Sequence, residues 1–151
     1  MTAPVVRSAA RVLLLDADGR VLLFRGHDPV RPEAGSWWFT VGGGVDEGES
    51  HRAAAARELF EETGLTLDED VLIGPLHTEL AEFSIAGTSY SQTNEFYAAR
   101  IDRHEVVTVG FTDLENELVL EYRWWSPGEL RATADTVFPE CLPDLVDRAR
   151  A

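Results

Sequence analysis

Three glutamates stand close together in the stretch RELFEETG, which covers residues 57–64. At about 100° per residue along a helix, Glu58, Glu61 and Glu62 fall within an arc of roughly 100° on one face. Like charges so arranged repel one another by about 0.2–0.5 kcal/mol per exposed pair, and Arg57 at the edge of the face is the cation best placed to offset this. Oxygen-rich clusters suit hard divalent cations. Taken alone, the cluster fits a solvated acidic helix face equally well.

A helix over residues 50–63 must position these carboxylates. Ser50 is suited to cap its N-terminus, and Gly64 is suited to the left-handed position that ends a helix. Ala54 and Ala55 fall on the acidic side, where their small side chains are expected to leave room above the carboxylates. The residues expected to face the core on the opposite side are Ala56, Leu59, Phe60 and Thr63.

Strands are predicted on both sides of this helix. Val- and Leu-rich runs flank a turn within residues 11–26, a pattern typical of a hairpin. A short aromatic strand is predicted at Ser36–Val41, and the three glycines at 42–44 are expected to break regular structure. Strands interrupted by helices favour one mixed α/β domain over residues 1–151. The remaining predictions are strands at 71–86, 89–101 and 118–126, a polar connection at 102–117 and a terminal helix at 140–150.

Composition excludes several classes of function. The 151 residues carry a net charge of -14, from 13 Lys+Arg against 27 Asp+Glu, which argues against nucleic-acid binding through a basic surface. Every basic residue is Arg, which excludes a Walker-type phosphate loop and a Schiff-base lysine. The only cysteine, Cys141, indicates a reducing compartment and is interpreted as a small buried side chain. No apolar run approaches the ~20 residues of a membrane span, so a cytoplasmic protein with no membrane partner is predicted.

Residues 43–65, GGVDEGESHRAAAARELFEETGL, carry a longer pattern. They resemble the signature of the Nudix hydrolases, which is a glycine, five residues, a glutamate, seven residues and then R-E-U-x-E-E-x-G-U, with U a bulky aliphatic. A chance match is on the order of 10⁻⁸ or less per starting position. Val41 departs from the proline that many relatives carry before the paired glycines. The fixed positions are all matched, by Gly43, Glu49, Arg57, Glu58, Leu59, Glu61, Glu62, Gly64 and Leu65.

The resemblance implies a Nudix-type α/β/α sandwich with a mixed β-sheet. It implies a Mg²⁺-dependent hydrolase, with Mn²⁺ as a substitute, that cleaves a diphosphate linkage in a small nucleotide-like molecule. The metal is expected on Glu58, Glu61 and Glu62, with the carbonyl of Gly42 assisting. Candidate substrates are nucleoside or deoxynucleoside triphosphates, ADP-ribose or another nucleotide sugar, and dinucleoside polyphosphates. Many relatives dimerise, so a homodimer is also an expectation.

Further residues complete the expected site. Arg57 and Glu49 are expected to form an orienting pair, and the resemblance implies that Arg57 is a catalytic group as much as a structural support. Gly43 is expected to support the structure beside this pair. The general base stays open between Glu58 and a carboxylate from a late loop. Glu115 is the first choice for that carboxylate, ahead of Glu117 and Glu95, although each of these also reads as a surface acid.

Substrate contacts are predicted less directly. Arg25 is suited to bind a phosphate as a forked donor, although a surface ion pair is equally consistent. Trp38 is expected to stack on a base, although aromatic residues on strands more often belong to the core. The other aromatic candidates for stacking are Trp37, Phe39, Phe83 and Tyr90.

Two other functions compete with hydrolysis. A non-hydrolytic, nucleotide-sensing Nudix binding module is the first, and the complete set of carboxylates disfavours it. An isomerase of allylic diphosphates is the second. That chemistry needs a reactive cysteine near the site, and Cys141 lies in the tail of the chain.

Overall fold

The computed structural model describes residues 3–102, 104–107 and 110–150. Its six-stranded sheet has the order β4-β5-β1-β3-β2-β6. β1 runs parallel to β5, whereas the other neighbouring pairs are antiparallel, so the sheet is mixed as predicted. The strands are β1 Val5–Leu15, β2 Val21–His27, β3 Ser36–Gly44, β4 Ile73–Ile85, β5 Thr88–Arg100 and β6 Val119–Trp125.

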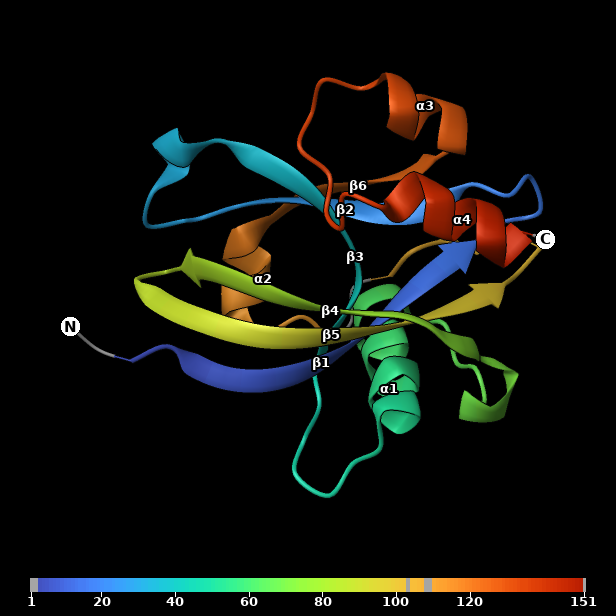
Figure 1. Ribbon diagram of the computed structural model, residues 1–151, viewed down its shortest axis with the longest axis horizontal. Coiled ribbons are helices and arrows are strands. Elements are labelled where there is room, and N and C mark those ends of the chain that lie inside the picture. The colour runs from blue at the N-terminus through green and yellow to red at the C-terminus, as the bar shows by residue number, and fades with distance from the viewer. Residues whose placement is uncertain (1–2, 103, 108–109, 151) are drawn as a thin grey trace.

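Helices cover both faces of the sheet (Figure 1). Successive residues of β1 point to opposite faces, so Val12 and Leu14 pack with Leu59 of α1, and Leu13 and Leu15 join the core beside α4. The predicted α/β/α sandwich is therefore confirmed. The helices are α1 His51–Thr63, α2 Asp113–Leu118, α3 Pro127–Ala132 and α4 Leu142–Arg150, with 3-10 turns at Pro32–Ala34 and Glu69–Val71.

The predicted hairpin over residues 11–26 is wrong in its pairing. β1 and β2 pair only at Leu15 and Val21, beside the turn. Beyond that point β3 lies between them, pairing with β1 through Val41–Gly44 and with β2 through Ser36–Thr40. A local turn specifies only the residues beside it, and here a third strand satisfies the backbone groups of both runs.

The glycines at 42–44 do not end the strand, contrary to the prediction. β3 continues through them, and Gly43 and Gly44 pair with β1. Gly42 has φ 145°, and a Cβ there would lie 2.3 Å from the carbonyl oxygen of Ala10. Glycine is therefore required at position 42 for close backbone approach rather than for a break.

The predicted orientation of the acidic helix needs correction. Its caps are confirmed, because the Ser50 side chain accepts a hydrogen bond from the N–H of Ala53 and Gly64 is left-handed. Ala54 and Ala55, however, are fully buried in the core, whereas Phe60 is 44% exposed. The small alanines bring α1 close to the sheet, and the acidic side of the helix is turned partly inward.

The later part of the chain holds two helices that the strand-and-loop prediction lacks. α2 begins inside the predicted connection at 102–117 and ends one residue beyond it, and α3 follows β6. Each begins with a capping box, formed by Thr112 with Glu115 and by Ser126 with Glu129. The T-x-x-E and S-x-x-E patterns were readable in the sequence. The terminal helix begins at Leu142, close to the predicted start.

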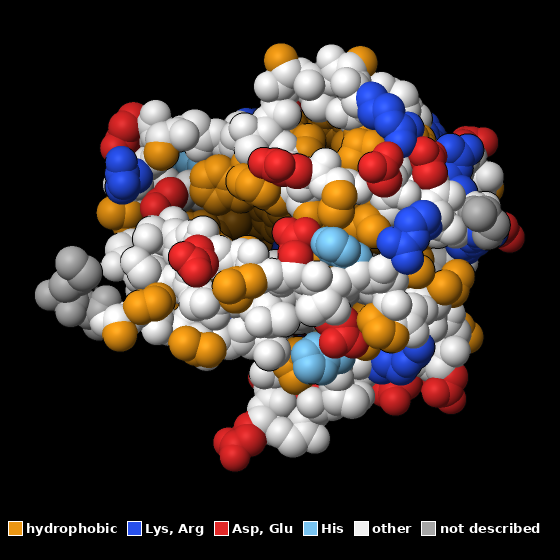
Figure 2. All heavy atoms as spheres, viewed as in Figure 1, with side chains coloured by type: hydrophobic (Ala, Val, Ile, Leu, Met, Phe, Trp, Pro, Cys, Tyr) orange, Lys and Arg blue, Asp and Glu red, His pale blue; other side chains and the backbone are white. Residues whose placement is uncertain are grey.

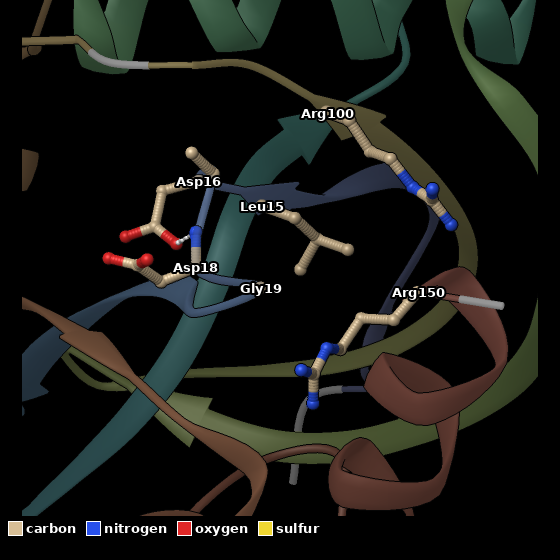
Figure 3. A pocket seen from close by; sticks show the side chains of 7 residues that line it. Leu15, Asp16, Asp18, Gly19, Arg100 and Arg150 are labelled. Atoms are coloured by element: carbon tan, nitrogen blue, oxygen red, sulfur yellow. Dashed lines mark hydrogen bonds between the residues drawn. The ribbon is translucent and has the colours of Figure 1, made fainter.

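A pocket of about 250 Å³ lies at the turn between β1 and β2, with Asp16 and Asp18 on one side of it and Arg100 and Arg150 on the other (Figure 3). Asp16 accepts hydrogen bonds from the N–H groups of Asp18 and Arg20, so it shapes the turn. None of the glutamates of α1 lines this pocket. Among the described residues, no helix has the length and apolar character needed to cross a bilayer.

Candidate functional site

Two glutamates of α1 are buried against β3. Glu58 is 8% exposed and Glu62 is 3% exposed. The N–H of Gly42 donates to Glu62 Oε1 at 2.8 Å. A Cβ on Gly43 would lie 2.5 Å from the carboxyl carbon of Glu58. The glycines of β3 thus allow both carboxylates to lie directly against the strand.

Arg57 holds the loop before α1 to the helix. Its Nε and Nη2 donate to the two oxygens of Glu49, each at 2.9 Å, and Nη2 also donates to the carbonyl of Gly44 at 2.8 Å. Nη1 donates to Glu58 Oε1 at 3.0 Å and to Glu61 Oε2 at 3.2 Å. The hydrogen bonds from Arg57 lower the pKa of Glu49. The forked contact with Glu49 holds the guanidinium in place, and its Nη1 then constrains the direction in which Glu58 points.

Glu115 of α2 joins the two buried glutamates. One ligand oxygen from each of Glu58, Glu62 and Glu115 lies within 4.8 Å of the others. Glu61 lies at the rim, where its side chain is 34% exposed and contacts Arg57. The first choice among the late carboxylates is therefore brought to the acidic cluster from far along the chain.

The other two late carboxylates have different surroundings. Glu95 accepts a hydrogen bond from the hydroxyl of Tyr97 and lies 3.9 Å from the Nε2 of His51. Glu117 is exposed, and its backbone carbonyl contacts the ring of His27. Neither belongs to the group formed by Glu58, Glu62 and Glu115.

The charged forms of the cluster formed by Glu58, Glu62 and Glu115 are disfavoured when no cation is bound among them. Burial raises the pKa of Glu62 well above its ordinary value, although Arg11 and the N–H of Gly42 act in the opposite direction. Burial and the neighbouring Glu61 raise the pKa of Glu58. A divalent cation would favour the charged forms of these groups. The donor set of carboxylate oxygens therefore fits a hard divalent cation.

Arg11 is a residue of this region that the sequence-based interpretation missed. Its Nη2 donates to the carbonyl of Thr40 at 2.9 Å, and its charge acts on Glu62 and Glu58. Burial lowers the pKa of the guanidinium, which nonetheless stays protonated. The available signal was an arginine inside a strand, directly before the apolar run at 12–15, where an unpaired charge is costly.

The two predicted substrate contacts lie on the other face of the sheet. Arg25 forms an ion pair of 2.8 Å with Glu121 and donates to the hydroxyl of Ser36. Trp38 is 4% exposed, packs edge-on against Trp125 with 5.0 Å between ring centroids, and belongs to the core beside α4. The structure thus places Arg25 and Trp38 away from the α1 side of the sheet.

The face that carries α4 and β4 is hollowed, with hydrophobic side chains deep inside the hollow (Figure 2). A buried polar row on β5 belongs to the same face of the sheet as Phe96, because residues alternate along a strand. In this row Gln92 donates to Asn94 at 2.7 Å and accepts from Arg7. Buried amides of this kind can recognise polar groups of a ligand.

The chain is similar to known proteins over most of its length. The family model for the NUDIX domain matches residues 5–145. The RNA pyrophosphohydrolase of Caulobacter vibrioides strain NA1000 / CB15N is 32% identical, over 90% of this chain and 79% of its own length. The RNA pyrophosphohydrolase of Rhodopseudomonas palustris strain BisA53 is 32% identical over 74% of this chain and 62% of its own.

Solved structures show the same fold. The E. coli ORF135 protein superposes with a TM-score of 0.65 at 18% identity, covering 98% of this chain and 93% of its own. The E. coli dihydroneopterin triphosphate pyrophosphohydrolase superposes with a TM-score of 0.63 at 22% identity, covering 95% and 96%. With the family model and the Caulobacter relative, these likenesses lead to one conclusion: the chain belongs to the Nudix family.

Proposed function

We propose that this Nudix enzyme is a Mg²⁺-dependent hydrolase that cleaves a diphosphate linkage in a nucleotide-like substrate. One observation carries the proposal: the ligand oxygens of Glu58, Glu62 and Glu115, from two separate helices, lie within 4.8 Å of one another. Such a group of carboxylates is costly to bury unless a cation is bound among them. The names of the Caulobacter and Rhodopseudomonas relatives, both RNA pyrophosphohydrolases, support the same reaction class.

Glu58 and Glu62 are the proposed principal metal ligands, because they are the most buried members of the cluster. Glu61 assists from the rim, and the carbonyl of Gly42 is the proposed backbone ligand. Mg²⁺ held there would neutralise phosphate charge and make water easier to deprotonate; Mn²⁺ can take the same oxygen ligands.

Glu115 is the proposed general base. It is half-buried and comes from α2, where it accepts a hydrogen bond from a neutral backbone N–H, whereas Glu58 is held by the charged Arg57. A base must reach the water that attacks phosphorus, and Glu115 reaches the cluster from α2, a different helix from the one that supplies the other acids. Arg57, with Glu49 and Gly43, positions Glu58 and does not itself take the proton.

The proposed substrate is a small molecule with a nucleotide-like diphosphate. We place its base or sugar in the hollow of Figure 2 and keep Arg25 and Trp38, which lie on the same face of the sheet as the polar row on β5, as the proposed contacts. The net charge of -14 disfavours long RNA, although the curated relatives are named for RNA. Action in the cytoplasm, a homodimer and a single domain over residues 1–151 stay predictions.

A substrate panel tests this proposal. The purified protein is incubated with Mg²⁺ and nucleoside triphosphates, deoxynucleoside triphosphates, ADP-ribose, nucleotide sugars, dinucleoside polyphosphates or 5′-triphosphorylated RNA, and the phosphate-containing products are measured. We expect a small nucleotide to be cleaved at a diphosphate linkage, with EDTA abolishing turnover. Turnover of RNA alone would contradict the proposed substrate class, and no turnover of any compound would favour a nucleotide-sensing module.

Glutamine variants test the assigned carboxylates. Glu58→Gln and Glu62→Gln should reduce turnover and raise the Mg²⁺ concentration needed for half-maximal rate. Glu115→Gln should reduce turnover on the order of 10²–10⁴-fold without that shift, as expected for loss of a base. Glu82→Gln, on an exposed position of β4, is the matched control. Unchanged turnover in Glu58→Gln and Glu62→Gln would refute the proposed metal site.

A further inference from the structure

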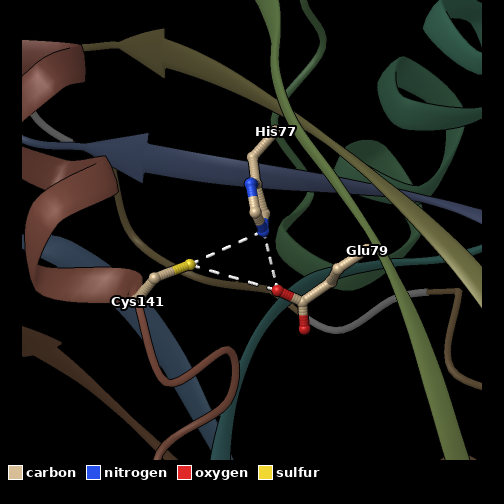
Figure 4. Close-up of side chains that lie close together, drawn as sticks. All are labelled: His77, Glu79 and Cys141. Atoms are coloured by element: carbon tan, nitrogen blue, oxygen red, sulfur yellow. Dashed lines mark hydrogen bonds and ion pairs between the residues drawn. The ribbon is translucent and has the colours of Figure 1, made fainter.

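A second group of metal-ligating side chains lies outside the acidic cluster (Figure 4). The Nε2 of His77 lies 2.7 Å from Glu79 Oε1, and the Sγ of Cys141 lies 3.6 Å from that nitrogen and 4.0 Å from that oxygen. His77 and Glu79 come from β4, and Cys141 directly precedes α4. All three residues are partly exposed, so an ion can reach them from solvent.

We propose that His77, Glu79 and Cys141 bind one Zn²⁺ ion. Zinc ligands at about 2.0–2.3 Å in tetrahedral geometry are separated from one another by about 3.3–3.6 Å. The two separations from Cys141, 3.6 and 4.0 Å, are already close to that range. His77 and Glu79, at 2.7 Å, need to part by only about half an ångström.

The donor set separates this site from the acidic cluster. Thiolate and imidazole ligands favour Zn²⁺, whereas a group made only of carboxylates favours Mg²⁺. The two groups also come from different elements. The ring of His77 packs 5.7 Å from that of Phe96, which belongs to the core beside α4, whereas Glu58 and Glu62 come from α1 on the other face.

The ion would join two parts of the chain that are distant in sequence. β4 is an edge strand of the sheet, and α4 is the last helix. Zn²⁺ on these residues would tie the edge strand to the start of α4, with the thiol proton of Cys141 released to solvent. Three protein ligands leave a fourth position for water.

Cobalt substitution tests the site directly, because Co²⁺ takes the same ligands and a thiolate bound to it gives a charge-transfer absorption band. The chelator-treated full chain is titrated with Co²⁺ in excess Mg²⁺, and Zn²⁺ is then added. We expect the band to saturate at one Co²⁺ per chain and to disappear as Zn²⁺ displaces it. Circular dichroism and unfolding curves check that each variant is folded.

Cys141→Ser should abolish the band, and His77→Ala should weaken Zn²⁺ binding at least tenfold. Two control variants should keep the Co²⁺ band and the affinity for Zn²⁺. His27→Ala removes a histidine distant in sequence from His77, and Glu58→Gln alters the acidic cluster. No band in the wild-type chain, or Zn²⁺ binding that survives His77→Ala and is lost in Glu58→Gln, would overturn the proposal. The band is independent of turnover, so an inactive protein that shows it contradicts the proposed hydrolase only.

Discussion

Gly43 and Gly44 of β3 differ in how closely the glutamates of α1 approach them. A Cβ on Gly43 would meet the carboxylate of Glu58 at 2.5 Å, whereas a Cβ on Gly44 would meet no atom within 4 Å. The atoms in the way at Gly43 belong to the end of a flexible side chain, so the chain can still fold. An alanine at position 43 would therefore displace the carboxylate of Glu58 and leave the packing of the core unchanged.

Gly43→Ala should therefore lower kcat while leaving the melting temperature nearly unchanged. A displacement of about 1 Å in a reacting group reduces rates on the order of 10²-fold. Steady-state kinetics on the best substrate and thermal unfolding measure the two effects. Gly44→Ala is the matched control and should behave like the wild type. Equal rates in the two variants would show that the position of Glu58 does not limit the reaction.

The short helices α2 and α3 have the same length and the same kind of N-terminal cap, but only α2 lies beside the acidic cluster. Each has six residues and a capping box, begun by Thr112 in α2 and by Ser126 in α3. Only α2 carries a member of the acidic cluster, because Glu115 is the third residue of that helix. The side chain of Glu115 also accepts from the N–H of Thr112 at 3.1 Å. The cap and the site therefore share a residue.

Thr112→Ala should reduce turnover, whereas Ser126→Ala should not. Loss of either N-cap lowers the free energy of unfolding by about 0.5–2 kcal/mol, but only the change at Thr112 loosens the helix that carries Glu115. Denaturant unfolding measures the first effect and kcat the second. If both variants lose the same stability and keep the same kcat, α2 does not position a catalytic group.

A buried aspartate fastens the turn between β4 and β5 to the loop after β2. Asp28 accepts hydrogen bonds from the N–H groups of Val30 at 2.9 Å and Ala86 at 3.0 Å. Burial alone would raise the pKa of Asp28, but these backbone hydrogen bonds outweigh it and hold the pKa below its ordinary value of 3.8. The charged carboxylate therefore stabilises the folded chain above that pH.

Asp28→Asn should make the chain less stable at neutral pH. The difference from the wild type should shrink as the pH falls below 3.8, because the wild-type carboxylate is then protonated on passing its lowered pKa. Urea unfolding at a series of pH values measures this difference. Asp18→Asn, at the exposed turn between β1 and β2, is the control. A difference that does not change with pH would contradict the assigned role of the charge.

The whole molecule should be stabilised by the cation that its acidic cluster is proposed to bind. A ligand at 100 times its dissociation constant adds about 2.7 kcal/mol to the free energy of unfolding. In a chain of this size that corresponds to a rise of roughly 5–10 °C in the melting temperature. Thermal unfolding with and without saturating Mg²⁺ measures the rise, which Glu62→Gln should remove. An equal rise in that variant would place the cation elsewhere.

Much of the site was readable in the sequence because it lies within one helix and the loop before it. The caps Ser50 and Gly64, the shared face of Glu58 and Glu62, and the family itself depend on spacing within residues 43–65. Local spacing determines which residues share a helix face. It does not determine which way that face turns, and here Ala54 and Ala55 lie in the core while Phe60 is exposed.

Contacts between distant segments were decided only by the tertiary structure. Four such contacts join parts of the chain that no local pattern connects. Glu115 approaches Glu62, and the charge of Arg11 lies beside them. Cys141 meets His77, and β3 is inserted between β1 and β2. The sequence by itself determined the acidic helix and the reaction class. The packing of that helix against the sheet, driven by burial of its apolar residues, decided which carboxylates are buried and which groups meet them.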